Sequence, residues 1–223
     1  MAETPPAPPL TIPGDLPAGS VLETLFVVRH GETAWNSEKR IQGSTDIPLA
    51  EAGEAQARRL AERFRGAAID AVYSSPQQRA LRTAEILGST LGLEPLARPA
   101  FGELHCGSFE GKSYAEVRER HPDEYRAWME NPEIAAPGGE SFNQFTARVG
   151  GGLREIFSSG HRRVLLSGHS GTSRAALAWL LGLDFRLAIR FEQRNTSVSI
   201  FRWEEGRLRL RLWNGTRHLD DVL

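Results

Sequence analysis

The sequence predicts an α/β fold in which a mainly parallel sheet carries helices on both faces. Short apolar runs rich in β-branched residues alternate with longer segments of helical periodicity along most of the 223-residue chain. Two of the apolar runs end in a histidine, at His30 and His169. Because ligands of open α/β sheets bind beyond the carboxyl ends of the strands, these histidines indicate where a functional site lies.

Composition excludes several classes of partner. The chain has a formal net charge of −1, with 40% hydrophobic and 25% charged residues, as in a globular protein. It has no surplus of positive charge for nucleic acid or an anionic membrane, so neither is expected as a partner. No apolar run approaches the ~18 residues that span a bilayer, and we expect a cytoplasmic protein.

Cysteine and histidine usage argues against a disulfide and against a metal site. Cys106 is the single cysteine, so no internal disulfide can form, which fits a reducing compartment. The six histidines and Cys106 show none of the paired spacings of metal ligands. The sequence therefore predicts no metal and no cofactor.

Residues 1–20 differ in composition from the rest of the chain. They contain six prolines, few apolar residues and no lysine or arginine. A secretory signal would need a basic start and a continuous apolar region, and this stretch has neither. We therefore predict a disordered proline-rich tail over 1–20 that adds little to stability, followed by a single domain over 21–223.

The first strand is predicted over 25–28 and leads directly into a polar turn. The polar residues and segments that follow it are Arg29, His30, Gly31, Asn36 and the loop 41–46. Gly31 permits a tight turn and a close approach of the backbone. This stretch is the first part of the candidate site.

A helix, a strand and a second helix are predicted next. The helix over 51–65 places Ala55, Leu60 and Phe64 on its apolar side, and a short strand follows over 69–73. The second helix is predicted over 76–91.

Ser75 and Pro76 resemble a helix start, with a capping hydroxyl followed by proline at the first helical position. Arg79 then lies in the first turn of the second helix, where a positive charge opposes the helix dipole. This placement is expected if Arg79 faces a bound anion.

The middle of the chain adds a candidate carboxylate. A strand predicted over 94–101 ends in a glycine-rich loop that contains Glu103. Two short helical pieces follow over 112–131, broken at the His121–Pro122 pair. A helix over 142–157 contains three consecutive glycines, which indicate close packing against a neighbour or a local break.

The last α/β unit matches the first. A buried strand over 163–168 ends at His169, and residues 170–173 open a helix that continues over 174–181. The free amides of a helix start beside His169 would form a ready anion site. Segments 195–204 and 207–213 alternate with period two and predict a β-hairpin.

These motifs, taken together and in this order, resemble the phosphoglycerate-mutase-like branch of the histidine phosphatase superfamily. The matching segments are 29–33 with Asn36, Gln42–Gly43, 46–49, 73–76 with Arg79, Arg82, Thr83 and Ala84, Glu103 with Gly107, Glu110 and Gly111, 137–141, and Gly168–His169. The resemblance covers about 25–218. It implies a three-layer αβα fold with about six strands and a helical cap segment at about 112–140.

The resemblance also implies the roles of the site residues. His30 would be the nucleophile that becomes phosphorylated, and Glu103 would protonate the leaving oxygen and then activate water. Arg29, Arg79 and His169 would surround the phosphoryl group, with Asn36 and Gln42 donating hydrogen bonds to its oxygens. Further substrate contacts are expected from Gly43, Gly171, His105 and His218, and a specificity wall from His105, Phe109, Tyr125, Trp128 and His218.

Arginines suit this chemistry, because forked guanidiniums spread positive charge around the equatorial oxygens of a transferring phosphoryl group. No lysine lies among the matched pocket residues, and no pair of carboxylates is available for magnesium. We therefore expect a metal-independent reaction. Neighbouring arginines should also keep His30 neutral and nucleophilic in the empty site.

The resemblance leaves three functions to compare: a phosphatase for small phosphomonoesters, a 2,3-bisphosphoglycerate-dependent phosphoglycerate mutase, and an inactive phosphate-binding scaffold. Related mutases carry an arginine directly after the catalytic glutamate, but here that residue is Leu104, and the basic residues of 112–131 are dispersed. We therefore expect a bisphosphate to bind no better than a monoester and favour a phosphatase, similar to broad-specificity, α-ribazole and metal-independent phosphoserine phosphatases. The particular metabolite and the formation of a homodimer are left open.

Overall fold

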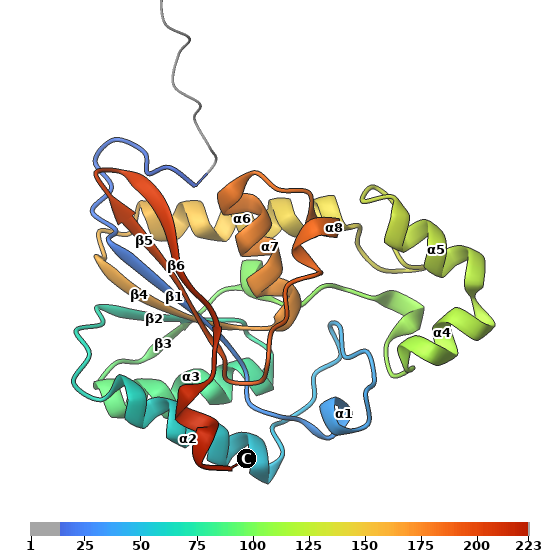
Figure 1. Cartoon of the computed structure of the whole chain (residues 1–223), viewed down its shortest axis with the longest axis horizontal. Coiled ribbons are helices and arrows are strands. Elements are labelled where there is room, and N and C mark those ends of the chain that lie inside the picture. The colour runs from blue at the N-terminus through green and yellow to red at the C-terminus, as the bar shows by residue number, and fades with distance from the viewer. Residues whose placement is uncertain (1–13, 223) are drawn as a thin grey trace, which may run out of the picture.

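The structure, a computed structural model, describes residues 14–222 and confirms the α/β class (Figure 1). The described residues form the strands β1 (Thr24–Arg29), β2 (Ala71–Ser74), β3 (Pro95–Ala97), β4 (Arg163–Gly168), β5 (Val198–Glu204) and β6 (Arg207–Gly215). They form the α-helices α1 (Ala34–Ser37), α2 (Glu51–Phe64), α3 (Gln78–Leu91), α4 (Tyr114–Arg120), α5 (Pro122–Glu130), α6 (Phe142–Phe157), α7 (Ser170–Leu181) and α8 (Phe185–Ala188). Three-residue-per-turn helices are η1 (Pro99–Phe101), η2 (Gly107–Phe109) and η3 (Arg217–Val222).

The strands form one sheet in the order β3-β2-β4-β1-β5-β6. Strands β3, β2, β4 and β1 are parallel, whereas the predicted hairpin β5–β6 joins the sheet antiparallel to β1. In the pairing of β1 with β4, Arg29 lies opposite Gly168. The residues that follow these two strands, His30 and His169, therefore leave the sheet side by side at its carboxyl edge.

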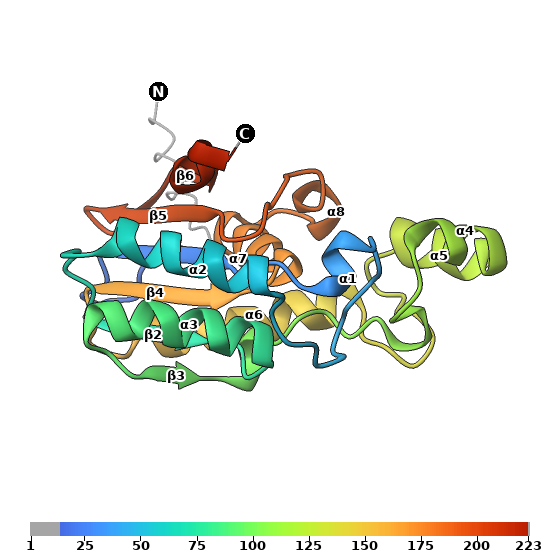
Figure 2. The same ribbon diagram turned by 90° about the horizontal axis from the view of Figure 1, so that it is seen from below.

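Helices cover both faces of the sheet, as predicted. Figures 1 and 2 show α6 and α7 on one face and α2 and α3 on the other. Along β1, Leu25 and Val27 belong to the apolar cluster under α6 and α7, while Phe26 and Val28 belong to the cluster under α2 and α3. The central strand is thus buried on both sides, which is why its sequence is continuously apolar.

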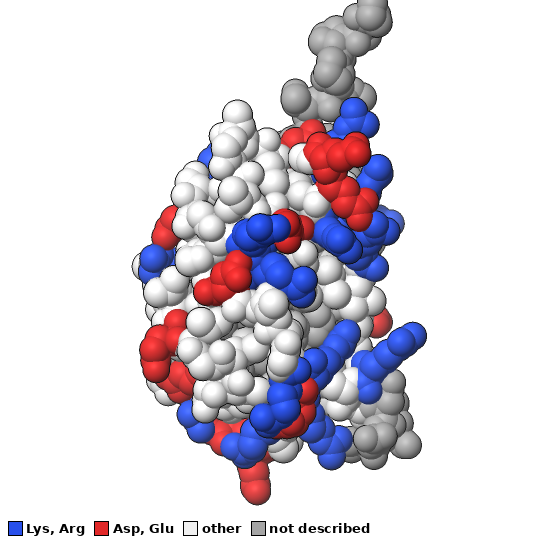
Figure 3. All heavy atoms as spheres, turned by 90° about the vertical axis from the view of Figure 1, so that its left-hand side faces the viewer, with Lys and Arg blue, Asp and Glu red and all other residues white. Residues whose placement is uncertain are grey.

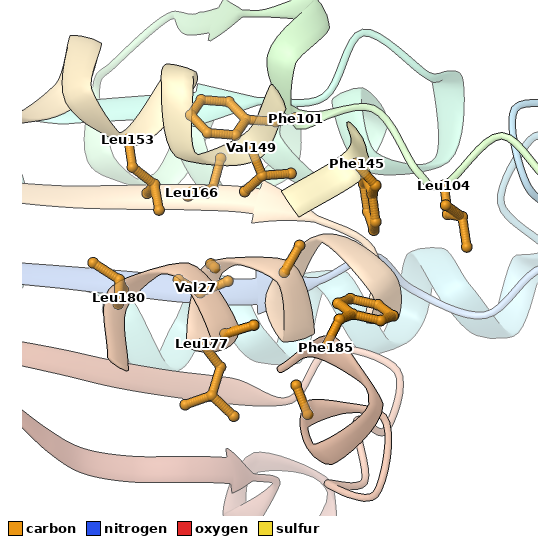
Figure 4. Packing of buried hydrophobic residues seen from close by; sticks show 14 of the residues in the cluster. Val27, Phe101, Leu104, Phe145, Val149, Leu153, Leu166, Leu177, Leu180 and Phe185 are labelled. Carbon is orange, nitrogen blue, oxygen red and sulfur yellow. The ribbon is translucent and has the colours of Figure 1, made fainter. Parts of the chain in front are cut away.

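The larger core extends to the site. Figure 4 shows Val149 and Leu177 packed around the central strands, with Phe145, Phe185 and Leu104 continuing the apolar cluster towards the carboxyl edge. The rings of Phe145 and Phe185 have centroids 5.8 Å apart and are packed edge to face. Because Leu104 follows Glu103 directly, this packing fixes the loop that carries the candidate carboxylate.

Helix α3 begins two residues later than the Ser75–Pro76 pattern predicts. Its N-cap residue is Gln77, whose side chain makes no capping hydrogen bond. Instead, the Asp46 carboxylate accepts the backbone N–H of Gln78 at 2.7 Å. An acceptor that lies so far away in the sequence cannot be recognised from a local capping pattern, which explains the error.

Other boundaries also differ from the prediction. The strand expected over 94–101 is interrupted by the η1 turn, because a proline cannot donate to the sheet. The strand expected over 69–73 begins at Ala71. In α2, Ala55 is exposed, whereas Gly53, Ala57 and Ala61 join Leu60 and Phe64 on the buried side.

Helices α4 and α5 form the predicted cap segment and lie beside the carboxyl edge of the sheet (Figures 1 and 2). The predicted break is confirmed, because His121 ends α4 and Pro122 begins α5. The Ser113 hydroxyl and the Glu116 side chain form a capping box at the start of α4. Trp128 is buried and attaches α5 to the core.

The beginning of the described chain corrects the predicted tail over 1–20. Trp203 donates a hydrogen bond from its indole N–H to the carbonyl oxygen of Gly14 at 2.6 Å. Leu16 packs against the larger core. This part of the predicted tail therefore contributes to the fold, and residues 1–13 lie outside the described residues.

The end of the molecule opposite the carboxyl edge carries acidic and basic side chains next to one another (Figure 3). Near the β5–β6 turn, Arg202 and Arg211 both pair with Glu204, and Arg162 pairs with Glu23. Exposed pairs of this kind contribute little to stability. No helix within residues 14–222 is long and apolar enough to cross a membrane.

Three consecutive glycines lie inside α6 without breaking it. A Cβ atom on Gly150 would lie 2.3 Å from Nε1 of Trp179, and one on Gly152 would lie 2.8 Å from the ring of Phe101. A Cβ atom on Gly151 would meet no atom within 4 Å. Two of the three glycines therefore permit close packing, and Gly151 only lowers the helix propensity.

We expect Gly151→Ala to raise the free energy of unfolding by about 0.5–1 kcal/mol, because alanine favours a helix more than glycine does. Gly150→Ala should lower it by about 1–3 kcal/mol, because Trp179 has to move. Urea unfolding of both variants beside the wild type measures the two changes. Equal effects at the two positions would contradict the packing of α6 against α7.

Candidate active site

His30 and His169 meet at the carboxyl edge of the sheet. The backbone N–H of His30 donates to the carbonyl oxygen of Gly168 at 2.9 Å, which continues the pairing of β1 with β4. The two imidazole rings lie edge to face with centroids 5.2 Å apart. Both side chains are buried, and the prediction that two strand ends bring these histidines together is confirmed.

The proton position on His30 follows from its contact with the next residue. Nδ1 of His30 lies 2.6 Å from the carbonyl oxygen of Gly31. A carbonyl oxygen can only accept, so Nδ1 carries the proton and donates it. In the neutral ring the lone pair is then on Nε2, the atom available for nucleophilic attack.

Both imidazoles are held in the neutral form. Burial lowers the pKa of His30 well below its usual value, and the charges of Arg29 and Arg79 lower it further. Burial likewise lowers the pKa of His169, with Arg79 as the next cause. Nε2 of His169 lies 2.8 Å from the hydroxyl oxygen of Ser75, at the end of β2.

Two arginines, the fully buried Arg79 and the half-buried Arg29, supply positive charge next to the histidines. Arg79 is fully buried and donates from its two terminal nitrogens to the carbonyl oxygens of Gly43 and Thr45, each at 2.8 Å. Arg29 donates to the carbonyl oxygen of Gln193 at 2.5 Å. Burial lowers the pKa of Arg29 to about 10, so it remains charged at neutral pH.

The loop that holds Arg79 is itself held by Glu110. This carboxylate accepts from the backbone N–H and hydroxyl groups of Ser44 and Thr45 and from the backbone N–H of Cys106. Burial would raise the pKa of Glu110, but these hydrogen bonds outweigh it and lower the pKa. Gly43 has φ +55°, and a Cβ atom there would lie 2.2 Å from the Glu110 carboxylate.

Asn36 and Gln42 lie at the cavity with Arg29 and His30, as predicted. Oδ1 of Asn36 accepts from the backbone N–H and hydroxyl groups of Thr33 and from the side-chain amide of Asn195. This arrangement orients the amide, and within 14–222 no acceptor contacts its Nδ2. The Nδ2 group is thus available to donate to an anion.

Glu103 faces the cavity with a fixed carboxylate. Its Oε1 accepts the N–H of Leu104 at 2.9 Å, and its Oε2 accepts the N–H of Gly171 at 3.1 Å. Gly171, which was predicted to contact substrate, lines the cavity and donates its amide N–H to Glu103. A Cβ atom on Gly171 would lie 2.1 Å from Oε1, so this close approach requires glycine. Gln77 connects the loop of Glu103 with the loop of Gly43. Its side chain accepts the backbone N–H of Glu103 and donates to the carbonyl oxygen of Gly43.

These residues surround a cavity of about 470 Å³, a volume typical of small-molecule sites. Its polar end consists of predicted residues: Arg29, His30, Asn36, Gln42, Gly43, Arg79, Glu103 and Gly171. Its remaining wall is formed by Trp35, Lys39, Arg40, Ile41, Leu104, Cys106, Tyr114, Trp128, Met129, Phe142, Ser170, Arg174, Phe185 and Ile189. The cavity therefore combines a cationic end with a largely apolar wall.

Several buried polar atoms at the cationic end have no partner. Among the described residues, seven buried side-chain nitrogen or oxygen atoms lack a hydrogen bond. Four of them belong to predicted site residues: Arg29, Gln42, Arg79 and His169. Unsatisfied buried polar atoms are rare in native proteins, and their concentration here indicates a site built to bind a polar ligand.

The structure does not bring His105 and His218 to the cavity, which corrects those two predictions. His105 is exposed, and its backbone N–H donates to Glu140 on the outer side of the loop. His218 lies in η3, where its Nε2 is 3.2 Å from the hydroxyl oxygen of Thr196. Of the predicted aromatic wall only Trp128 lines the cavity, because Phe109 and Tyr125 pack into the core behind it.

Sequence reasoning missed Lys39, Tyr114 and Arg174, which line the same cavity. Nothing local distinguishes these residues from ordinary surface residues of a loop or a helix start. The one available signal was the position of Arg174 one turn into the helix that follows His169. Asn195, also missed, donates to the carbonyl oxygen of His30 at 3.1 Å and helps to hold the backbone of that residue.

Within the described part of the chain, no three or more histidine, cysteine, aspartate or glutamate side chains form a cluster that could hold a metal ion. The charges that lower the pKa of His30 are those of Arg29 and Arg79. The donor set at the cavity therefore suits an anion.

Comparison with known proteins points to one family. A sequence model described as the histidine phosphatase superfamily (branch 1) matches residues 25–216. Phosphoserine phosphatase 1 of Hydrogenobacter thermophilus is 34% identical over 199 residues, which are 88% of this chain and 94% of the relative. Phosphoglycerate mutase-like protein 4 of Arabidopsis thaliana is 35% identical over 207 residues, or 89% of this chain and 87% of the relative.

Solved structures show the same similarity. A mycobacterial glucosyl-3-phosphoglycerate phosphatase in complex with VO3 superimposes with a TM-score of 0.77 at 31% identity. The match covers 86% of this chain and 99% of that structure.

We expect the free energy of unfolding to fall as the pH drops below about 6.5, the ordinary pKa of histidine. His30 and His169 have lowered pKa values when folded, so protons bind preferentially to the unfolded chain. The stability that the neutral rings contribute is fully present above the histidine pKa of the unfolded chain. It is lost as the pH falls towards the lowered histidine pKa values of the folded chain. Each ring should contribute a slope of about 1.4 kcal/mol per pH unit.

Urea unfolding of the wild type, His30→Asn and His169→Asn between about pH 5 and 7 measures this slope. In each variant the free energy of unfolding should depend less steeply on pH, by about 1.4 kcal/mol per pH unit, which is the contribution of one proton. Unchanged slopes in both variants would show that the rings titrate normally in the folded chain.

Proposed function

The chain belongs to the histidine phosphatase superfamily, and on this premise we propose that it is a metal-independent phosphatase that hydrolyses small phosphomonoesters through a phosphohistidine at His30. Relatives named as phosphatases, including a phosphoserine phosphatase, support the reaction class. The observation that carries the proposal is the unprotonated Nε2 of His30 beside the guanidiniums of Arg29 and Arg79.

Substrate binding would rest on charge and on fixed donors. Arg29 and Arg79 would attract the phosphoryl dianion and spread positive charge around its oxygens. Their guanidiniums are already held by backbone carbonyls, so little reorganisation would be needed when the anion arrives. Asn36 and Gln42 would add neutral donors.

In the first step, Nε2 of His30 would form a bond to phosphorus while the bond from phosphorus to the leaving oxygen breaks. The leaving oxygen would take a proton from Glu103, which the amides of Leu104 and Gly171 hold in place. The bond between Nδ1–H and the Gly31 carbonyl would stabilise the positive charge that develops on the ring.

In the second step, water would attack phosphorus and give a proton to the Glu103 carboxylate, while the bond between phosphorus and Nε2 breaks. Inorganic phosphate would leave, His30 would return to its neutral form and Glu103 to its protonated form. Two easier displacements would thus replace one difficult hydrolysis.

We expect the enzyme to form an acid-labile, base-stable phosphohistidine at His30 and to hydrolyse p-nitrophenyl phosphate. His30→Ala should reduce turnover by several orders of magnitude, because it removes the covalent nucleophile. His105→Ala is the matched control, since that exposed ring lies outside the cavity. Rapid quenching with labelled substrate, followed by mapping of the phosphorylated residue, tests whether His30 carries the phosphoryl group.

A label found on a serine, or equal losses in the two variants, would overturn the assignment of His30.

Activity should also survive exhaustive chelation with EDTA, because arginines occupy the place of metal-binding carboxylates. Loss of activity that a divalent ion restores would contradict metal independence. Absence of any phosphatase activity would favour a phosphate-binding scaffold.

A second candidate is a phosphoglycerate mutase, which the relatives named phosphoglycerate mutase-like favour. A mutase must retain a second anion and exclude water while the phosphoryl group moves. Leu104 stands here where related mutases have an arginine, so water should be the usual acceptor.

We expect phosphate release without added 2,3-bisphosphoglycerate, and interconversion of 2- and 3-phosphoglycerate slower by at least ~100-fold, or about 2.7 kcal/mol in barrier height. Both rates are measured on one preparation, with and without the bisphosphate. Faster isomerisation would replace the phosphatase proposal with the mutase.

A further inference from the structure

The loop that carries Glu103 is held mainly by side chains. Along residues 103–106, each backbone N–H group donates to a side-chain oxygen at 2.8–3.0 Å. The acceptors are the Oε1 atoms of Gln77, Glu103, Glu140 and Glu110, in that order. Because backbone groups that lose water need other partners, the conformation of this loop depends on the side chains around it.

Arg148 supplies donors for the carbonyl groups of the same loop. From α6, its Nη1 donates to the carbonyl oxygens of Pro99, Ala100 and Gly102 at 3.1–3.3 Å. Its Nη2 donates to the carbonyl oxygen of Glu103 at 3.2 Å. One guanidinium therefore follows the backbone from η1 to the residue that carries the candidate carboxylate.

Glu140 holds the loop on the other side of Glu103. Its carboxylate accepts from Nε and Nη2 of Arg148 and from the backbone N–H of His105. The backbone N–H of Glu140 donates in turn to the carbonyl oxygen of His105 at 2.9 Å. The ion pair of Arg148 and Glu140 therefore fixes the backbone up to Glu103 and again at His105.

This ion pair lies at the edge of the core. The side chains of Arg148 and Glu140 are 30% and 17% exposed. The guanidinium carbon of Arg148 lies 5.0 Å from the ring centroid of Phe145, which is fully buried. A Cβ atom on Gly171, whose amide holds the Glu103 carboxylate, would lie 3.2 Å from the same ring. Packing as well as charge therefore fixes the position of Arg148.

A role in stability alone leaves part of this geometry unexplained. Arg98, beside η1, already joins this region to α6 by pairing with Glu155 at 2.6 Å. Its other hydrogen bond is to the carbonyl oxygen of Ala97, on the far side of η1 from Glu103. Two arginine–glutamate pairs thus connect α6 with the same segment, and of the two arginines it is Arg148 that contacts Glu103.

We propose that Arg148, together with Glu140, is a positioning residue that aligns Glu103 for proton transfer to the leaving oxygen. The inference rests on the proposed phosphatase function. Arg148 does not line the cavity, so it would act through Glu103. Without its guanidinium, four carbonyl groups of 99–103 would lose a donor, and the Glu103 carboxylate would no longer have one fixed direction. The bonds that hold Arg29 and Arg79 do not involve Arg148, so phosphoryl binding should persist.

Leaving groups of different basicity test the inference. Phenyl phosphate and p-nitrophenyl phosphate share a ring, but phenolate is the more basic leaving group and depends more on a proton from Glu103. Arg148→Met should lower kcat/KM about 10- to 100-fold for phenyl phosphate and less than about 3-fold for p-nitrophenyl phosphate. Arg148→Lys keeps the charge without the fork and should recover part of the loss.

Matched variants separate positioning from a general loss of structure. Arg98→Met removes the neighbouring arginine–glutamate pair and should leave the ratio of the two kcat/KM values unchanged. In a Glu103→Gln background, Arg148→Met should cost less than about 2-fold for phenyl phosphate, because the proton donor is already absent. Glu140→Gln weakens the pair but keeps the guanidinium, and should lower the same ratio by a smaller factor.

An unchanged ratio in Arg148→Met would overturn the inference, whether both esters lose activity or neither does. An equal cost of Arg148→Met with and without the Glu103 carboxyl group would also overturn it. Hydrogen exchange of residues 103–106 tests the support of the loop without turnover, and it should be faster in Arg148→Met but unchanged in Arg98→Met. Absence of turnover would contradict the proposed function, whereas exchange that Arg148→Met leaves unchanged would contradict the role of Arg148.

Discussion

The arrangement of the site depends on keeping two guanidiniums charged inside the protein. Arg79 is fully buried, and the carbonyl oxygens of Gly43 and Thr45 compensate much of the hydration that it loses. Arg29 uses the Gln193 carbonyl in the same way. Neutral carbonyls stabilise the cations without cancelling their charge, so the field remains available to an anion.

This constraint explains the polar network around the cavity. Glu110 fixes the backbone next to the carbonyl groups that hold Arg79, because it accepts the backbone N–H groups of Ser44 and Thr45. Gln77 then connects this loop with the backbone of Glu103. The groups assigned to phosphoryl binding and to proton transfer thus belong to one hydrogen-bonded unit, and a change in either loop is transmitted to the other.

The same field accounts for the state of the histidines. Two imidazoles that lie 5.2 Å apart and are buried beside two cations cannot both be protonated without a large electrostatic penalty. Their neutrality in the empty site follows from position and does not require a separate base. Arrival of a phosphoryl dianion would offset the charge of the two guanidiniums, so the positive charge that develops on the His30 ring during attack would meet less repulsion.

The sequence by itself determined the fold class and the cationic end of the site. Buried strands give apolar runs, and each run that reaches the carboxyl edge ends abruptly in polar residues, so His30 and His169 could be identified from local pattern alone. The helix over 142–157 and the break at His121–Pro122 could be identified in the same way. Family resemblance then gave roles to Glu103 and Gln42, which line the cavity.

Only the tertiary structure decided which residues far apart in the chain meet. Asp46 caps α3 from a loop, the hairpin β5–β6 adds to β1 in the antiparallel sense, and Arg174 reaches the cavity from α7. Conversely, His105 lies one residue beyond Leu104 yet faces outward. Sequence patterns record burial and backbone conformation within a segment, whereas the direction of a loop side chain depends on packing between segments, which no local pattern contains.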